Sequence, residues 1–258
     1  MTGRPAMPQQ VRARWARPAE RPLVLGHRGA SARVTENTLD AFLAARDAGA
    51  DGVELDARLC ASGQVVVFHD DDLARLAGRG ERIDRLSLEQ LGRVRLDGDR
   101  RIPTLDDVFA LVSAEDWIIN VELKTSSFRS AALIDGVLGC IERHRMADRV
   151  LVSSFDPLAI ARVRRRARRL LTGLLFHGGQ PLPFRRALCA PLVRPHAVHP
   201  QHKLVTRTSL AAWRERGYAV NTWTVDGPDR QREVAQLGVD AIVTNDPAAC
   251  LTAIGVAR

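Results

Sequence analysis

The chemistry that this sequence could perform centres on a short stretch with two carboxylates and a histidine. Glu54 and Asp56 are separated by one residue, and a turn at Ser62-Gly63 brings the chain back to His69. Parallel strands need a crossover of about a dozen residues or more, so the two arms around this turn must be antiparallel. With a simple two-residue loop, Asp56 lies opposite His69, and opposed residues project from the same face. Alternate strand residues share a face as well, so Glu54 joins this pair.

A second predicted strand repeats this arrangement of charged side chains. In "VELK", Glu122 and Lys124 share one face. If both strands end at the same mouth of one barrel, Glu54, Asp56 and Glu122 converge there. Three oxygen ligands with room for water suit Mg²⁺ or Ca²⁺. The alternative is that the carboxylates pair with neighbouring arginines, but a buried cluster of like charges is costly unless a cation neutralises it. We therefore expect a divalent-cation site.

Two histidines and two basic side chains complete a set suited to phosphate chemistry. His27 and Arg28 end the first predicted strand, where barrel enzymes keep catalytic groups. A lone histidine there would more often be structural, but paired with His69 it becomes an acid/base candidate. Arg28 offers a planar donor fork for a phosphate, and Lys124 supplies a second positive charge. Lys124 could instead form a Schiff base, but the nearby Glu122 favours its protonated form.

Other aromatic and histidine side chains have a structural interpretation beside a functional one. Trp223 shares a face with Asn221, which is typical of core packing, although at a barrel mouth it would form an apolar wall for substrate. A metal site is the alternative for three histidines near the sixth predicted strand, His196, His199 and His202. We interpret these as mainly structural, with His199 the one expected to face the mouth.

Short apolar runs alternate with helical patterns along almost the whole chain. The runs that predict strands are residues 23–29, 51–60, 116–124, 149–155, 170–176, 196–200, 218–225 and 239–246. Helices are predicted between them, with Thr104 and Asp156 as N-caps. Eight such repeats predict an α/β fold of the (β/α)8 TIM-barrel type. The alternative, an open doubly wound sheet, is disfavoured because no G-x-G-x-x-G follows the first strand.

One segment does not fit the alternation of strands and helices. Residues 71 to about 102 form an irregular insertion after the β-hairpin that follows the second strand. It contains one short helix that begins at Ser87, where Gln90 completes a capping box. At the catalytic end of a barrel, such an insertion would lie over the active site as a lid or wall.

Length and composition fit one barrel domain over residues 22–258. The chain has 258 residues, of which 45% are apolar, and no run is long enough to span a membrane. Residues 1–21 are rich in Arg and Pro and lack a long apolar run, which predicts a flexible basic leader rather than a secretory signal. The four cysteines form no C-x-x-C pair, which favours reduced thiols and a cytoplasmic location.

The net charge of +8 has its densest source in the arginines of residues 161–170. A solvated helix face is the preferred interpretation, and weak contact with an anionic membrane surface is the alternative. No aromatic residues alternate with these arginines, so we expect no nucleic-acid partner. Nothing in the sequence predicts an oligomeric state.

The motifs and their order resemble the glycerophosphodiester phosphodiesterase family over about residues 23–250. The motifs that carry the resemblance are "GHRGA", "TENTLDAF", "GADGVELDARL", "VVFHDDDL", "IPTLDDVF", "NVELK", "SSFDP", "VNTWTVD" and "GVDAIVTNDP". The resemblance implies a (β/α)8 barrel with a small insertion after "HD". It also implies catalysis by His27 and His69, metal binding by Glu54, Asp56 and Glu122, phosphate binding by Arg28 and Lys124, and substrate contact by Trp223 and Glu36.

Two departures from the family pattern concern the shape of the mouth rather than the catalytic groups. Thr35 stands where proline is usual before Glu36-Asn37, and "RLAG" replaces the usual Arg-Thr-Thr. The function expected from the resemblance is metal-dependent hydrolysis of a glycerophosphodiester to glycerol 3-phosphate and an alcohol. The alternatives are hydrolysis of lysophospholipids, in the manner of lysophospholipase D, and a barrel that binds phosphodiesters without turnover.

Overall fold

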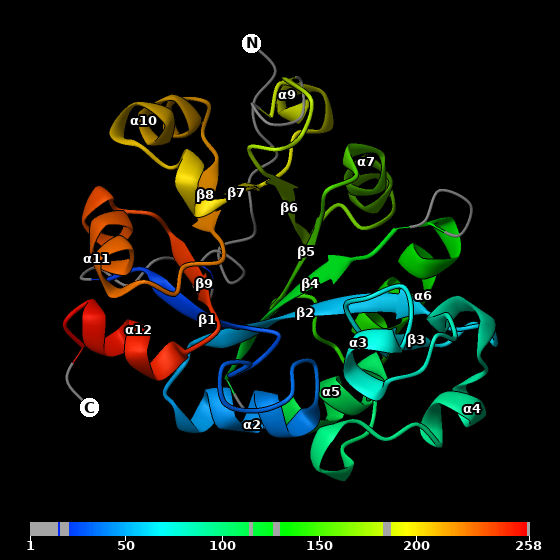
Figure 1. Cartoon of the computed structure of the whole chain (residues 1–258). Helices are drawn as coiled ribbons and strands as arrows, with labels where there is room; N and C mark the ends of the chain where they lie inside the picture. The colour runs from blue at the N-terminus through cyan, green and yellow to red at the C-terminus, as the bar shows by residue number, and fades with distance from the viewer. Residues whose placement is uncertain (1–14, 16–20, 114–115, 126–129, 183–186, 257–258) are drawn as a thin grey trace.

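The computed structural model describes residues 15, 21–113, 116–125, 130–182 and 187–256. Within this part of the chain, eight parallel strands form a closed barrel with helices outside it (Figure 1). The ring closes because β1 pairs with both β9 and β2. The barrel strands are β1 (Leu23–His27), β2 (Gly52–Leu59), β4 (Ile118–Leu123), β5 (Val150–Ser154), β6 (Leu171–Phe176), β7 (Ala197–Pro200), β8 (Ala219–Thr222) and β9 (Ala241–Thr244). The predicted TIM barrel is confirmed.

Two of the helices outside the barrel begin at the predicted caps, Thr104 and Asp156. Thr104 accepts a hydrogen bond from the backbone N–H of Asp107 at the start of the helix that begins at Leu105. Asp156 accepts one from the backbone N–H of Leu158 at the start of the helix that begins at Pro157. The outer helices are α2 (Leu39–Asp47), α5 (Leu105–Val112), α6 (Ser130–Arg143), α7 (Pro157–Arg166), α9 (Ala190–Val193), α10 (Arg207–Glu215), α11 (Pro228–Leu237) and α12 (Pro247–Ala253). A 3-10 turn, His202–Leu204, precedes α10.

The register of three neighbouring strands places charged residues at one end of the barrel. His27 on β1 is level with Glu54 on β2, and Asp56 on β2 is level with Glu122 on β4. These residues lie toward the C-terminal ends of parallel strands, which is the catalytic face of such barrels. The strands themselves are almost wholly buried, as expected when helices cover the outer face of a parallel sheet.

The opposite, N-terminal end of the barrel is covered by an aromatic side chain. Trp15 packs against two apolar clusters whose members lie mainly at strand starts. The buried members of these clusters are Leu23, Leu25, Ile118, Ala241, Val243, Leu151, Leu171 and Ala197. Trp15 therefore covers the barrel floor. The rest of the predicted leader, residues 1–14 and 16–20, lies outside the described residues.

The hairpin after β2 differs from the predicted register by one residue. β3 (Val65–Val67) pairs antiparallel with β2 as predicted, but the loop has three residues rather than two. Asp56 is consequently level with Phe68, whose N–H donates to the Asp56 carbonyl at 2.9 Å, and not with His69. The physical reason is Gly63, whose φ of +90° ends a three-residue hairpin loop in the left-handed conformation that glycine adopts freely.

The insertion packs on this hairpin and has a small core of its own. Its helices are α3 (Ala74–Ala77) and α4 (Leu88–Gly92), with 3-10 turns at Ile83–Arg85 and Asp97–Asp99. The predicted capping box of Ser87 and Gln90 is confirmed. The apolar cluster that joins the insertion to the hairpin consists of Cys60, Val66, Phe68, Leu73, Ile83, Leu91, Val94, Leu96 and Ile102. The insertion therefore lies at one side of the barrel, next to β3 (Figure 1).

The Arg-rich segment, residues 161–170, covers the second half of α7 and the turn after it, and several of its arginines contact the protein. Arg162 donates to Ser130, Arg164 contacts His196, and Arg166 pairs with Asp135. Such contacts are typical of a solvated helix face, and the predicted contact with an anionic membrane surface stays a prediction. Among the described residues, none of the helices combines the length and apolar character needed to cross a membrane.

Candidate active site

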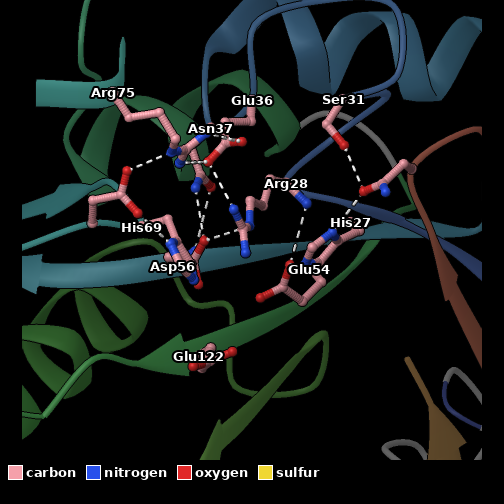
Figure 2. A network of polar contacts seen from close by, with 12 residues as sticks. His27, Arg28, Ser31, Glu36, Asn37, Glu54, Asp56, His69, Arg75 and Glu122 are labelled. Carbon is pink, nitrogen blue, oxygen red and sulfur yellow. Dashed lines mark hydrogen bonds and ion pairs between the residues drawn. The ribbon is translucent and has the colours of Figure 1, made fainter. Parts of the chain in front are cut away.

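Three buried carboxylates meet at the C-terminal mouth of the barrel. One oxygen atom from each of Glu54, Asp56 and Glu122 lies within 4.8 Å of the corresponding atoms of the other two. The exposed fraction of the surface is 4% for Glu54, 1% for Asp56 and 7% for Glu122. They come from the adjacent strands β2 and β4, on which Asp56 is level with Glu122 (Figure 2). The structure thus brings together the residues that the sequence suggested as metal ligands.

Asp56 is surrounded by donors and is ionised. Its Oδ2 accepts a hydrogen bond from Asn37 Nδ2 at 2.8 Å and lies 3.2 Å from Arg28 Nε. Its Oδ1 lies 3.0 Å from Lys124 Nζ. Burial alone would raise the pKa of Asp56, but the charges of Lys124 and Arg28 hold that pKa well below 3.8. A negative charge is therefore fixed at the centre of the site.

Glu54 lacks the partners that Asp56 has. Its Oε2 accepts from the Arg28 backbone N–H at 3.2 Å, while Oε1 is buried with no hydrogen-bond partner among the described residues. Burial and the charges of Asp56 and Glu122 raise the pKa of Glu54 well above 4.5. Burial also raises the pKa of Glu122. A divalent cation would contact the unpartnered oxygen and offset the repulsion, so these residues fit such an ion.

Lys124 bridges two of the carboxylates. Its Nζ donates to Glu122 Oε1 at 2.5 Å and lies near Asp56. Burial opposes its charge, but Asp56 and Glu122 together raise the pKa of Lys124 above 10.5. The side chain is therefore an ammonium group at neutral pH, which suits contact with a phosphate and disfavours the Schiff-base alternative.

His27 lies at the end of β1 and is neutral. Its Nδ1 is 2.7 Å from Asn245 Oδ1, and its Nε2 is 3.9 Å from Glu54 Oε2. Burial and the neighbouring charge of Arg28 lower the pKa of His27 to about 4. An unprotonated ring nitrogen is thus available near the carboxylates at neutral pH.

His69 reaches the same site from beyond the end of β3 (Figure 2). Its Nδ1 is 2.7 Å from Asp70 Oδ1, and Arg58 donates to its backbone carbonyl at 2.9 Å. Burial lowers the pKa of His69, and the charge of Asp56 opposes that shift. His27 at the end of β1 and His69 in the segment after β3 therefore lie on different elements beside the carboxylates, although the hairpin register differs from the predicted one.

A network of arginines and carboxylates borders this site (Figure 2). Arg28 Nη1 donates to Glu36 Oε1 at 2.8 Å, and Arg75 of the insertion donates to both oxygens of Glu36. Arg75 Nε also donates to Asp70 Oδ2 at 2.6 Å. Glu36, expected from the family resemblance to contact substrate, is occupied by two arginines and holds Arg28 in place.

The loop between β1 and α2 has an unusual backbone at the site. Arg28 and Asn37 have φ values of +55° and +56°, in a region that residues with side chains rarely adopt. Gly29 follows with φ +88°, and a Cβ there would lie 2.6 Å from the backbone of Ala41. Glycine at this position lets the loop pack closely on α2, which directs both Arg28 and Asn37 toward Asp56.

The aromatic residue Trp223 directly follows β8 and packs beside Phe155. Their ring centroids are 5.5 Å apart with an interplanar angle of 87°. The Trp223 indole N–H donates to the His199 carbonyl at 2.8 Å. His199 is buried, and its Nε2 lies 3.0 Å from Asn221 Nδ2. Among the described residues, the side chains grouped closely enough to hold a metal ion are the three carboxylates, so the metal-site alternative for His196, His199 and His202 gains no support.

Several side chains of the site were not singled out by motif spacing. Asn245 follows the last barrel strand, Phe155 follows β5, and Arg75 belongs to the insertion. The signal for Asn245 and Phe155 was their place at the C-terminal ends of predicted strands, where polar and aromatic side chains meet substrate. Arg75 had no comparable signal because the insertion is irregular.

The sequence model of the glycerophosphoryl diester phosphodiesterase family matches residues 27–249, which span the barrel, the hairpin and the insertion. The chain belongs to this family. As a member of the glycerophosphoryl diester phosphodiesterase family it is an enzyme, a hydrolase of glycerophosphodiesters.

Relatives of known name agree with this assignment. A glycerophosphodiester phosphodiesterase of Caldanaerobacter subterraneus subsp. tengcongensis is 31% identical over 233 residues, which cover 87% of this chain and 94% of that protein. A probable glycerophosphodiester phosphodiesterase of Mycobacterium tuberculosis is 30% identical over 253 residues, which cover 92% and 91% of the two chains.

Solved structures share the fold. The glycerophosphodiester phosphodiesterase of Thermotoga maritima has a TM-score of 0.75 and 31% identity, over 90% of this chain and 97% of that one. An Oleispira antarctica phosphodiesterase, solved in complex with the product sn-glycerol-3-phosphate, has a TM-score of 0.83 and 24% identity, over 91% and 97%.

Proposed function

We propose that this enzyme hydrolyses glycerophosphodiesters with a divalent cation, Ca²⁺ or Mg²⁺, and with His27 and His69 as a general acid/base pair. The observation that carries the proposal is the cluster of Glu54, Asp56 and Glu122, buried and close together, with one Glu54 oxygen that lacks a hydrogen-bond partner among the described residues. Buried like charges are costly, and a hard cation with oxygen ligands relieves that cost.

The three carboxylates would hold the cation, which when bound would polarise a phosphoryl oxygen as a Lewis acid. Arg28 and Lys124 lie beside the carboxylates with their charges directed into the same space. Both would contact the phosphate and stabilise the negative charge that grows on its oxygens.

The two imidazoles would move protons on opposite sides of the phosphate. The neutral His27 would accept a proton at Nε2 from the attacking oxygen, since its Nδ1 is already bonded to Asn245. His69, whose Nδ1 lies 2.7 Å from Asp70 Oδ1, would donate the Nε2 proton of its imidazolium form to the departing alkoxide. Each proton transfer should contribute on the order of a hundredfold to ten-thousandfold. The attacking oxygen is either water or a substrate hydroxyl that first gives a cyclic phosphate.

The expected products are glycerol 3-phosphate and an alcohol. The fold neighbour from Oleispira antarctica binds sn-glycerol-3-phosphate as its product, which supports the same product here. Trp223 and Phe155 form an aromatic pair after β8 and β5, and they would wall the side of the pocket that receives the glycerol or the alcohol.

A substrate panel tests this proposal directly. Purified protein should release alcohol from glycerophosphocholine or glycerophosphoethanolamine with Ca²⁺ or Mg²⁺, and lose this activity in EDTA. His27→Ala and His69→Ala should each lower kcat by about a hundredfold or more while circular dichroism stays unchanged. Release of alcohol from none of the diesters, or activity that EDTA leaves intact, would contradict it. Tight binding without turnover would support the binding-barrel alternative instead.

A second candidate function, hydrolysis of lysophospholipids, is favoured by one observation. Four large apolar side chains are exposed on α7 and on the connection between β6 and β7: Leu158, Leu182, Leu188 and Leu192. Leu192 is 86% exposed, and exposed leucines of this kind would contact an acyl chain. Residues 183–186 of this connection lie outside the described residues. Faster turnover of a long-chain lysophospholipid than of glycerophosphocholine would establish this candidate.

The predicted cytoplasmic location also stays a proposal. It is supported by the four cysteines, none of which is joined in a disulfide in the structure. Reduced thiols persist in a compartment buffered by glutathione and thioredoxin. Fractionation of the producing cell would test it.

A further inference from the structure

We propose that Asp226, in the loop after β8, determines which ring nitrogen of His27 carries the proton. The connection passes through Asn245, whose side-chain amide lies between the two residues. Asp226 fixes the orientation of this amide, and the amide fixes the tautomer of His27. The inference rests on the proposed function of His27 as the group that accepts a proton.

The first contact joins residues from opposite ends of the chain. His27 Nδ1 lies 2.7 Å from Asn245 Oδ1, and Ser31 Oγ donates to the same oxygen at 2.8 Å (Figure 2). His27 ends β1 and Asn245 directly follows β9, so the pairing of these two strands brings them together. The side-chain oxygen of Asn245 thus serves two neighbours at the barrel mouth.

The second contact decides which end of the Asn245 amide faces His27. The oxygen and nitrogen of an amide have nearly the same shape, so the surrounding network determines its orientation. Asp226 Oδ2 accepts from Asn245 Nδ2 at 2.7 Å, and Asp226 Oδ1 accepts from the Asn245 backbone N–H at 2.9 Å. An ionised carboxylate only accepts hydrogen bonds, so the NH2 group must face Asp226 and the oxygen must face His27.

The tautomer of His27 follows from this orientation. Because the amide oxygen is an acceptor only, the hydrogen bond to it requires a proton on Nδ1. Neutral His27 then has an unprotonated Nε2, and this is the nitrogen that lies 3.9 Å from Glu54 Oε2 within the carboxylate cluster. A group that accepts a proton from an attacking oxygen needs a free lone pair at that position.

Removal of the charge at Asp226 removes this constraint. In the variant Asp226→Asn the new amide can donate as well as accept, so the Asn245 amide is free to rotate and turn its NH2 group toward His27. That orientation favours a proton on Nε2 and blocks the accepting lone pair. Asp226 is exposed, so the change should leave the barrel intact.

The test that needs no turnover is ¹⁵N NMR of histidine-labelled full-length protein without added cation. Protonated and unprotonated nitrogens of a neutral imidazole have well-separated ¹⁵N shifts, and the His27 signals are assigned by their loss in His27→Gln. We expect Nδ1–H in the wild type and a shift toward Nε2–H in Asp226→Asn. The control Asp229→Asn alters an exposed carboxylate nearby and should leave the signals unchanged.

The rescue variant exchanges the two groups. Combined Asn245→Asp and Asp226→Asn places a carboxylate beside His27 and an amide beyond it, so the acceptor for Nδ1–H returns. We expect the wild-type tautomer in this double variant. In steady-state assays, Asp226→Asn should lower kcat by about tenfold to a hundredfold with KM nearly unchanged, and the double variant should recover most of the loss.

The outcomes separate this inference from the proposed function. A wild-type spectrum with Nε2–H, or an Asp226→Asn spectrum identical to wild type, overturns the inference even if the enzyme hydrolyses its substrate normally. The expected spectra together with a wild type that lacks all turnover uphold the link from Asp226 to His27 and refute the catalytic proposal.

Discussion

Arg75 and Glu36 are joined by two hydrogen bonds, Nη1 to Oε2 at 2.9 Å and Nη2 to Oε1 at 2.7 Å. Arg75 belongs to the insertion, and Glu36 belongs to the loop after the first barrel strand. The third donor of Arg75 reaches Asp70, which is the partner of His69, while Glu36 also holds Arg28. One arginine thus connects a proposed phosphate contact with a proposed proton donor.

Replacement of Arg75 by Ala should impair both functions at once. Without Arg75, Glu36 keeps Arg28 as its partner among the described residues, and Asp70 keeps His69 but loses Arg75. We therefore expect kcat to fall by about tenfold or more and KM to rise by a few fold. Steady-state kinetics with a glycerophosphodiester measures both parameters. The matched control is Arg79→Ala, which removes an exposed pair with Glu81 in the same insertion. Equal effects of the two variants would contradict the role of Arg75.

Removal of the charge on Glu54 should stabilise the cation-free fold and weaken the binding of the cation. Folding raises the pKa of Glu54 above its unfolded value, so between the two values the native state binds more protons. The ionised group therefore destabilises the cation-free protein above about pH 4.5, increasingly as the pH rises through the folded pKa. Glu54→Gln removes this penalty, and we expect a higher Tm than wild type at pH 7 in EDTA.

The same variant should lose its response to the cation. Ca²⁺ or Mg²⁺ should raise the Tm of the wild type, because a ligand that binds only the native state stabilises it. Glu54→Gln should show little of this rise and at least about a hundredfold lower kcat. Differential scanning fluorimetry with and without cation checks the first result. An unchanged Tm rise in the variant would exclude Glu54 as a ligand.

The pH dependence of kcat/KM should reflect the environment of His27. Burial and Arg28 lower the pKa of His27 to about 4, so the imidazole stays unprotonated at pH values where an ordinary histidine is charged. Below the pKa the ring is protonated and cannot accept a proton. We therefore expect the acidic limb of the profile to lie below pH 6.5. A limb centred at or above pH 6.5 would argue against His27 as the base.

Trp15 should contribute to stability and not to turnover. It packs on the barrel floor, at the end opposite the carboxylates. Trp15→Ala should cost about 2 kcal/mol of unfolding free energy, because the side chain is only partly buried, while kcat stays within about twofold of wild type. Urea denaturation and kinetics measure the two quantities. Trp15→Phe keeps most of the apolar contact and should restore most of the stability.

The barrel could be predicted because its signals are local. Buried strands are short apolar runs, and Thr104, Asp156 and Ser87 cap helices where the sequence indicates. Glu54 and Asp56 share a face because alternate residues of a strand point the same way. They meet Glu122 because the C-terminal ends of the parallel strands lie at the same end of the barrel. These rules need no knowledge of distant contacts.

The parts that could not be predicted depend on a single backbone angle or on long-range pairing. The positive φ of Gly63 adds one residue to the hairpin loop and shifts the register at Asp56. Asn245 meets His27 across 218 residues, through closure of the ring between β1 and β9. Sequence places both residues at strand ends, but only the closed barrel makes them neighbours.

The hairpin and the insertion share an apolar cluster that is separate from the main core of the barrel. His27 is anchored in the barrel, whereas His69 follows β3, whose Val66 packs in this separate cluster while Val65 and Val67 pack in the main core. The distance between the two imidazoles therefore depends in part on the packing of the insertion against the hairpin. Peripheral units of this kind open at lower free energy than a central core. Mild heat or low denaturant should consequently abolish activity at conditions where the circular dichroism signal of the barrel is still native.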